Sequence, residues 1–265
     1  MQQKPQTISA DLLAEMIALD QRNDNPSEMA LAKLRREIEK VRTEEVDAYH
    51  ALLAAWHALR FDLSETLSHA RSALNLTFNP TIASNAVLSV QKSGNLAEAM
   101  NLSELSLRKF PGAPSILRAE EIVCFEGGRL TRGLLAEQSL ERMNIPVRDL
   151  PFKKVLEILE SRQHSEEELS ALLISVRLFF SSVRRKVCGF SVKRISEYDR
   201  IGDFVVYAFY LGRTLEECLK FEDEVFQHLD TLNLPIYRDG TVLISLTARK
   251  PTGHTKDEHR TEEAH

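Results

Sequence analysis

Residues 81–114, TIASNAVLSVQKSGNLAEAMNLSELSLRKFPGAP, decide the fold. Apolar residues recur every three to four positions on both sides of Gly94, which indicates two helices joined by a tight turn. Glycine suits this turn because the chain needs a positive φ where the first helix ends. Pro111 cannot continue the second helix and therefore ends it. The stretch predicts helices over 82–92 and 96–109.

The same unit recurs on both sides of this stretch. Gly128 follows Gly94 by 34 residues, and Asp62 precedes Asn95 by 33 residues. Each of these positions lies between two helical stretches of similar length. A fixed spacing of this size indicates a helical-repeat array. We divide the array into units at about 47–80, 81–114 and 115–146.

The spacing resembles the tetratricopeptide repeat, a helix-turn-helix unit of 34 residues. The middle unit shows the resemblance best, through Gly94, Ala99, Leu107 and Pro111. The flanking units keep fewer of the small and apolar positions: Leu53, Ala54, Ala73 and Leu74 in the first, and Gly128 and Leu130 in the third, with Gly133 where alanine is usual. The resemblance implies a superhelical array over about residues 47–146 whose concave face grips a peptide or a helix.

The resemblance also implies which residues contact the partner. The positions implied for the concave face are Ala48, Ala51, Ala55, Ser84, Asn85, Leu88, Arg118 and Ile122. One subgroup of the family binds acidic C-terminal tails through Lys, Arg and Asn on the first helices, and only Asn85 and Arg118 have that character here. The small and apolar remainder favours a groove for a helix or an apolar peptide. The alternative is that residues 8–45 fill this face. The candidate partner-binding residues are Ser84, Asn85, Leu88, Arg118 and Ile122.

The helical pattern gives way to a small α+β domain after Pro146. Residues 151–160 read as a capping helix, and Ser165 opens the next helix with a capping box. The predicted order is then a helix to about 184, strands over 188–196 and 203–211, a helix over 214–232, and short strands at 236–237 and 241–246 around a tight turn.

The predicted fold class is mostly α, with an N-terminal tetratricopeptide-like array followed by this α+β domain. Residues 250–265 are polar and charged, without an apolar face, which is typical of a disordered tail. The predicted divisions are 1–148 for the array, 149–164 for a linker, 165–249 for the α+β domain and 250–265 for the tail.

A basic run in the α+β domain is the main alternative site. Its candidate nucleic-acid-binding residues are Arg184, Arg185, Lys186, Lys193 and Arg194, because such charges contact phosphates without sequence preference. The competing interpretation pairs them with the acidic helix over 214–232, or between subunits. The net charge of −5 argues against general coating of nucleic acid.

Neither a catalytic constellation nor a cofactor motif is present in the sequence, so the prediction leans away from an enzyme and includes no cofactor. Tyr207, Tyr210 and Asp239 are the polar candidates near predicted strand ends. The adjacent carboxylates Glu120 and Glu121 are predicted to face water on an amphipathic helix.

We predict no metal site. His50 and His57 lie seven positions apart on one predicted helix, whereas helical metal pairs more often use a spacing of four with a carboxylate. They are interpreted as packing residues. The three cysteines form no CxxC pair, and the histidines of the predicted tail read as solvated: His254, His259 and His265.

The function predicted from the sequence is a non-catalytic protein–protein interaction module: an adaptor, an assembly scaffold or a chaperone. The polar N-terminus lacks the apolar run of a signal peptide, and no apolar stretch is long enough to span a membrane. The expected location is therefore the cytoplasm, with a protein partner and a possible homo-oligomer. Nucleic acid is the less favoured partner, and no membrane contact is expected.

Overall fold

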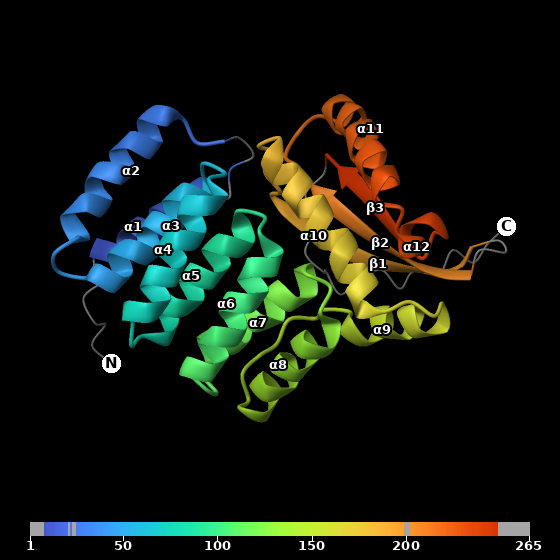
Figure 1. Cartoon of the computed structure of the whole chain (residues 1–265), viewed down its shortest axis with the longest axis horizontal. Helices are drawn as coiled ribbons and strands as arrows, with labels where there is room; N and C mark the ends of the chain where they lie inside the picture. The colour runs from blue at the N-terminus through green and yellow to red at the C-terminus, as the bar shows by residue number, and fades with distance from the viewer. Residues whose placement is uncertain (1–7, 21, 23–24, 199–201, 249–265) are drawn as a thin grey trace, which may run out of the picture.

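The computed structural model describes residues 8–20, 22, 25–198 and 202–248. Within these residues, ten consecutive helices precede a three-stranded sheet (Figure 1). The helices are α1 (Ile8–Asp20), α2 (Glu28–Val41), α3 (Val46–Ala58), α4 (Leu63–Leu76), α5 (Pro80–Lys92), α6 (Leu96–Lys109), α7 (Pro114–Glu126), α8 (Leu130–Arg142), α9 (Phe152–Ser161) and α10 (Glu166–Ser182). The prediction of a helical array is confirmed.

Local sequence signals fix the helix ends in the array. The side chains of Asp62, Asn79 and Asn95 each accept a hydrogen bond from a backbone N–H in the first turn of α4, α5 and α6. These N-caps satisfy donors that have no partner within the helix. Pro80 and Pro114 occupy first helical positions, where their fixed φ suits the helix and no N–H is needed.

Small residues pack the successive helix pairs α3/α4, α5/α6 and α7/α8 closely. The core of these pairs is alanine-rich, and Ala54, Ala73, Ala83 and Ala99 are fully buried. A methyl side chain lets two helix backbones approach, and this explains why alanine occupies the crossing points. The N-terminal helices α1 and α2 add a second cluster around Trp56, whose indole donates to the Leu31 carbonyl at 2.8 Å.

Helix α10 crosses the turn ends of two of these pairs. Gly94, at φ +94°, faces the α10 backbone so closely that an added Cβ would lie 2.8 Å from the Arg177 carbonyl oxygen. Gly128, at φ +72°, faces the backbone nitrogen of Ser170, which an added Cβ would approach to 2.8 Å. The two glycines therefore have two roles: they adopt the positive φ of the turn, and they leave room for the backbone of α10.

Tertiary packing also explains why residue 133 is glycine. It stands where the repeat pattern usually has alanine, and the Phe152 ring of α9 occupies the space that a Cβ would need. Phe152 is 1% exposed. The departure from the repeat pattern thus coincides with the point where the next helix packs on the array.

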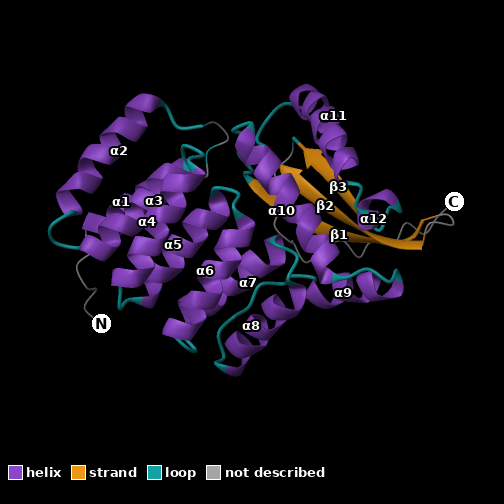
Figure 2. Cartoon of the chain, viewed as in Figure 1, coloured by secondary structure: helices purple, strands orange, loops and turns teal. Residues whose placement is uncertain are grey.

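The sheet follows α10 and has the order β1-β2-β3 (Figure 2). Strands β1 (Gly189–Tyr198) and β2 (Gly202–Tyr210) pair antiparallel, with Phe190 opposite Phe209. Strand β3 (Val242–Thr247) pairs parallel to β2, with Val242 opposite Val205. A parallel neighbour needs a crossover, which α11 (Leu215–Leu232) provides.

One predicted strand is wrong. Ile236 and Tyr237 belong to a short helix, α12 (Pro235–Arg238), and not to a hairpin with β3. Asn233, in the left-handed conformation, ends α11, and Pro235 begins α12 with a φ suited to a helix. The predicted central position of the apolar strand over 203–211 is confirmed by the strand order.

A single hydrophobic cluster joins the array to the C-terminal part. Phe125 and Leu130 of the array lie in the same cluster as α9, α10, the sheet and α11. The sheet contributes alternate residues of β2, Val205, Tyr207 and Phe209. The predicted boundary at residue 148 therefore lies within a continuous core and stays a prediction, and the predicted tail over 250–265 lies outside the described residues.

Among the described residues, no helix has the length and apolar character needed to cross a membrane.

Candidate functional site: a cationic cavity between the array and the α10–β1 connection

A cavity of about 380 Å³ lies between α1, α3 and α5 on one side and the α10–β1 connection on the other. This volume is within the range of small-molecule and side-chain pockets. Its apolar wall combines helices distant in sequence: Leu13, Met16, Ile17, Ala55, Leu59, Leu88, Phe180, Val187 and Phe190. The cavity therefore exists only because α1 and β1 are brought together across the array.

The C-terminal end of α1 is tied to the α10–β1 connection by Lys186. Its Nζ donates to the backbone oxygens of Leu19 at 3.2 Å and Arg22 at 2.9 Å, and lies 3.6 Å from Asp20. Asp20 also pairs with Lys92 at the end of α5. Burial lowers the pKa of Lys186, and the Asp20 carboxylate opposes this shift.

A second charged group lies deeper in the wall of the cavity. Arg177 is buried and donates to the Gln91 carbonyl oxygen at 3.2 Å, with Glu126 at 3.9 Å. Gln91 in turn donates to the Glu126 carboxylate at 2.5 Å. Burial lowers the pKa of Arg177, while Glu126 opposes the shift. These bonds attach α10 to the C-terminal ends of α5 and α7.

The cavity carries a positive charge in a negative protein. Four cationic side chains and two carboxylates line it, a surplus of two positive charges, whereas the whole chain has a net charge of −5. Two of the cations share the single Asp20 carboxylate. Low-dielectric walls strengthen such a field, so the cavity favours an apolar ligand with an anionic group. The charged lining residues are Asp20, Lys92, Glu126, Arg177, Arg185 and Lys186.

The structure brings two of the predicted partner-binding residues into the cavity wall. Asn85 and Leu88 line it from α5. Ser84 is buried, and its hydroxyl donates to the Ser115 carbonyl oxygen at 3.0 Å.

The two residues predicted on α7 lie apart from the cavity lining. The Arg118 guanidinium lies 3.3 Å from the Glu121 carboxylate, and Ile122 is half-buried.

Helix α1 covers part of the inner face predicted for the array. Ala48 and Ala51 of α3 line, with Ser9 and Ala10 of α1, a second cavity of about 300 Å³. The alternative that the N-terminal helices occupy this face therefore fits only in part. These helices cover α3, but the cavity beside Leu88 remains between α1 and α5.

The predicted basic run is divided among several intramolecular contacts. Besides the Lys186 contacts, Arg194 pairs with Asp203 and lies 3.5 Å from Glu157. Arg185 lies over the Phe221 ring at 5.3 Å. Arg184 and Lys193 are exposed. The carboxylates that face Lys186 and Arg194 come from α1, α9 and β2, and not from the acidic helix that the sequence suggested.

The expectation that Glu120 and Glu121 face water is wrong. Both are buried, at 2% and 0% exposed, and both pair with arginine. Glu120 lies 2.7 Å from Arg132 of α8. A helix packed on both sides by neighbours has no fully solvated face, so its carboxylates need such partners.

The polar candidates for an enzyme do not converge. Tyr207 is 1% exposed in the core, and burial raises the pKa of its hydroxyl. Asp239 instead accepts from His164 Nε2 at 2.7 Å in a connection between α12 and α10. Neither of the two cavities described above is lined by Tyr207, Tyr210 or Asp239.

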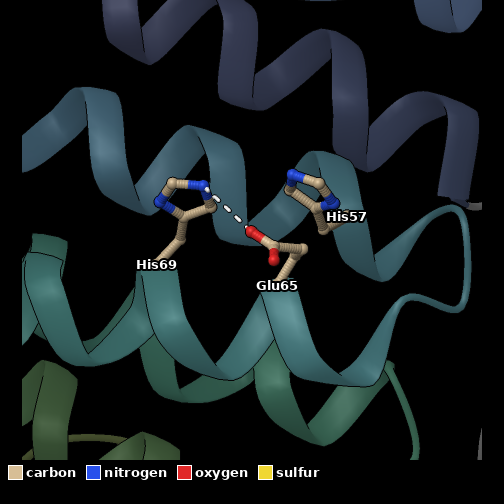
Figure 3. Close-up of side chains that lie close together, drawn as sticks. All are labelled: His57, Glu65 and His69. Carbon is tan, nitrogen blue, oxygen red and sulfur yellow. Dashed lines mark ion pairs between the residues drawn. The ribbon is translucent and has the colours of Figure 1, made fainter.

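A cluster of histidines lies on a different surface, across α3 and α4 (Figure 3). The His57 and His69 rings stack with centroids 5.4 Å apart, and Glu65 reaches toward His69, with its Oε2 3.9 Å from His69 Nε2. His50 Nδ1 lies 3.0 Å from His69 Nδ1. Burial lowers the pKa of His50, His57 and His69, and Asp62 opposes the shift at His57.

Sequence reasoning overlooked half of this cluster. The signal for the other half is the pair Glu65 and His69, which stand four positions apart, the spacing typical of helical metal pairs. Pairing α3 with α4 in the predicted hairpin would have brought the two sets together.

Comparisons of the chain with protein-family models, with curated proteins and with solved structures found no match.

Proposed function

We propose that this protein is a non-catalytic interaction module that binds a short apolar segment of a partner protein, carrying an acidic group, in the cationic cavity. The observation that carries the proposal is the cavity itself, with its apolar wall and its surplus of positive charge. An apolar side chain of the partner would fill the space beside Leu88. The acidic group would then lie near Lys92, which is 43% exposed.

The resemblance to tetratricopeptide repeats supports the same function. Arrays of that family bind peptides on the face formed by the first helix of each pair. Ala55 of α3 and Leu88 of α5, both on first helices, line the cavity. An adaptor or chaperone that holds an extended segment is thus the form of activity that we propose, in the cytoplasm.

The nucleic-acid alternative has weaker support. Phosphate contacts require cations that point to solvent, whereas Lys186 and Arg194 are held by carbonyl or carboxylate oxygens of the chain. Replacing Arg184, Arg185 and Lys186 tests it, because salt-sensitive binding to DNA or RNA would then be lost.

The experiment is a selection of random peptides displayed on phage against the full chain, followed by affinity measurements on the enriched peptides. We expect enriched sequences that combine apolar side chains with Asp, Glu or a free C-terminus. Leu88→Glu places a negative charge in the apolar wall and is expected to weaken binding at least tenfold. Lys92→Gln is expected to weaken binding less and to reduce its dependence on salt.

Leu105→Glu is the matched control. Leu105 lies on α6 of the same helix pair and is 45% exposed, so its replacement leaves the cavity intact. Circular dichroism checks that both glutamate variants keep their helices. Equal affinity of Leu88→Glu, Leu105→Glu and the unaltered chain for the enriched peptides would overturn the proposal.

A further inference from the structure

The His57–Glu65–His69 cluster has the donor types and the proximity of a metal site. One ligand atom from each of the three residues lies within 4.8 Å of the other two. Four-coordinate zinc holds its ligands at about 2.0–2.2 Å, which places ligand atoms roughly 3.3 Å from one another. Glu65 is 53% exposed, so a side-chain rotation at the surface can close this difference without moving a helix.

The helix pair explains why the donors meet. Glu65 and His69 are four positions apart on α4 and therefore share a face. His57 lies near the end of α3. Helix α3 packs directly against α4, to which the short connection over 59–62 joins it. Two ligands from one helix and a third from its neighbour make a site that depends on one hairpin alone.

The second nitrogen of each imidazole is already occupied. His57 Nδ1 lies 3.3 Å from the Asp62 carboxylate, and His69 Nδ1 lies 3.0 Å from His50 Nδ1. Metal-binding histidines commonly have their remaining ring nitrogen held in this way, because the contact fixes the tautomer and the ring orientation. The Nε2 atoms of His57 and His69 are left for a ligand, and His69 Nε2 already faces Glu65.

Carboxylates outnumber cations around the histidine cluster. Arg35 is the cation whose charge acts on both His57 and His69, and its guanidinium pairs with Glu39 at 2.7 Å. Asp62 and Glu65 add two carboxylates to the cluster. A divalent cation would therefore meet a site with an excess of negative charge.

We propose that His57, Glu65 and His69 bind a divalent transition-metal ion, with zinc the best match to two imidazoles and a carboxylate. Imidazole suits zinc and the neighbouring transition metals, whereas calcium and magnesium prefer oxygen donors alone. Three protein ligands leave a fourth coordination position for water. Both histidines are partly exposed, at 13% and 20%, so an ion can enter from solvent.

The test is titration of the full chain with Zn²⁺ by calorimetry and with Co²⁺ by visible absorption, which reports tetrahedral coordination. Every sample carries His254→Gln, His259→Gln and His265→Gln, so that the C-terminal histidines cannot contribute. We expect one ion per chain. His69→Gln and His57→Gln are expected to weaken binding at least a hundredfold, and Asp62→Asn about tenfold.

His228→Gln is the matched control, because this histidine lies on α11 and contacts Ser175 and Phe179 instead. Glu65→Gln changes an exposed side chain and keeps the test valid if a histidine variant fails to fold. Zn²⁺ should also raise the melting temperature of the unaltered cluster and leave that of the Glu65→Gln variant nearly unchanged.

Binding that survives both His57→Gln and His69→Gln, or the absence of stoichiometric binding to the folded chain, would overturn the proposal. In the latter case the histidines would be a hydrogen-bonded packing cluster only. Peptide binding in the cationic cavity is measured separately, so the two proposals fail independently.

Discussion

The helix pairs of the array and the sheet of the C-terminal part differ in how far their contacts reach along the chain. Helices α5 and α6 pack together across a connection of residues 93–95. Strands β2 and β3 pair with each other although residues 211–241 separate them along the chain. The comparison shows that helical spacing alone predicts the first region, whereas the second depends on pairing between distant segments.

A further lesson concerns the contact between the regions. The turn glycines of the array look like local features, yet Gly94 and Gly128 are also where α10 docks. Phe125 belongs to α7 by sequence and to the C-terminal core by packing. The two regions therefore differ in how their elements form but share one core.

The largest effect is expected from cutting the chain between the two regions. The fragment 1–148 should keep much of its helical circular dichroism, because the pairs α3/α4 and α5/α6 close on themselves. Its melting temperature should fall well below that of the full chain, because Phe125 and Leu130 lose the cover of α9 and α10. A fragment without helical signal would contradict the division at 148, and one as stable as the full chain would contradict the shared core.

Phe152→Ala tests the contact without cutting the chain. Its ring fills the space above Gly133, so we expect a loss of about 3–5 kcal/mol in the free energy of unfolding. The measurement is urea denaturation followed by circular dichroism. Phe78→Ala is the control, because this ring is 91% exposed and its removal should change stability little. Equal effects of the two variants would argue that α9 does not pack as described.

Gly94→Ala should reduce stability by a smaller amount. It distinguishes the cost of straining the turn from the cost of disturbing the packing of α10. Its Cβ would collide with α10 in addition to straining a positive φ, and we expect a cost of about 2–3 kcal/mol. Gly240→Ala has a similar φ of +75° with no atom within 4 Å, and should cost about 1 kcal/mol. Thermal unfolding compares the two. A Gly94→Ala variant no worse than Gly240→Ala would mean that α10 does not approach the turn closely.

The smallest effect concerns pH. Burial opposes protonation of His164, but hydrogen bonds to Asp239 at 2.7 Å and Glu168 at 3.1 Å overcome it and raise the pKa of His164 above its usual 6.5. Protonated His164 therefore stabilises the folded chain fully below about pH 6.5, and this stabilisation is lost as pH rises through the raised pKa of His164.

The difference in melting temperature between the unaltered chain and His164→Gln checks this prediction. The advantage of the unaltered chain should be larger at pH 5.5 than at pH 8. A difference that grows with pH would show that His164 is neutral in the folded chain.

Part of the candidate sites could be predicted from the sequence. The resemblance located Asn85 and Leu88 on the inner face, and both line the cavity. It could not locate Lys186, which lies far along the chain and contacts the C-terminal end of α1 only in the folded structure. Only part of the histidine cluster could be predicted. The repeat predicts that the helices carrying His57 and His69 pack against each other, but it does not predict which residues of the two helices lie opposite one another.

The sequence by itself determined the helices of the array, because apolar spacing, N-caps such as Asn79 and Asn95, and turn glycines are all local signals. It also determined that β2 would be a central strand, because apolar side chains follow one another along it. Only the tertiary structure decided that α12 replaces a strand and that Glu120 and Glu121 are buried. It alone assembled the cationic cavity and the histidine cluster. The physical reason is that burial, charge pairing and cavity shape arise from contacts between segments whose separation no local pattern encodes.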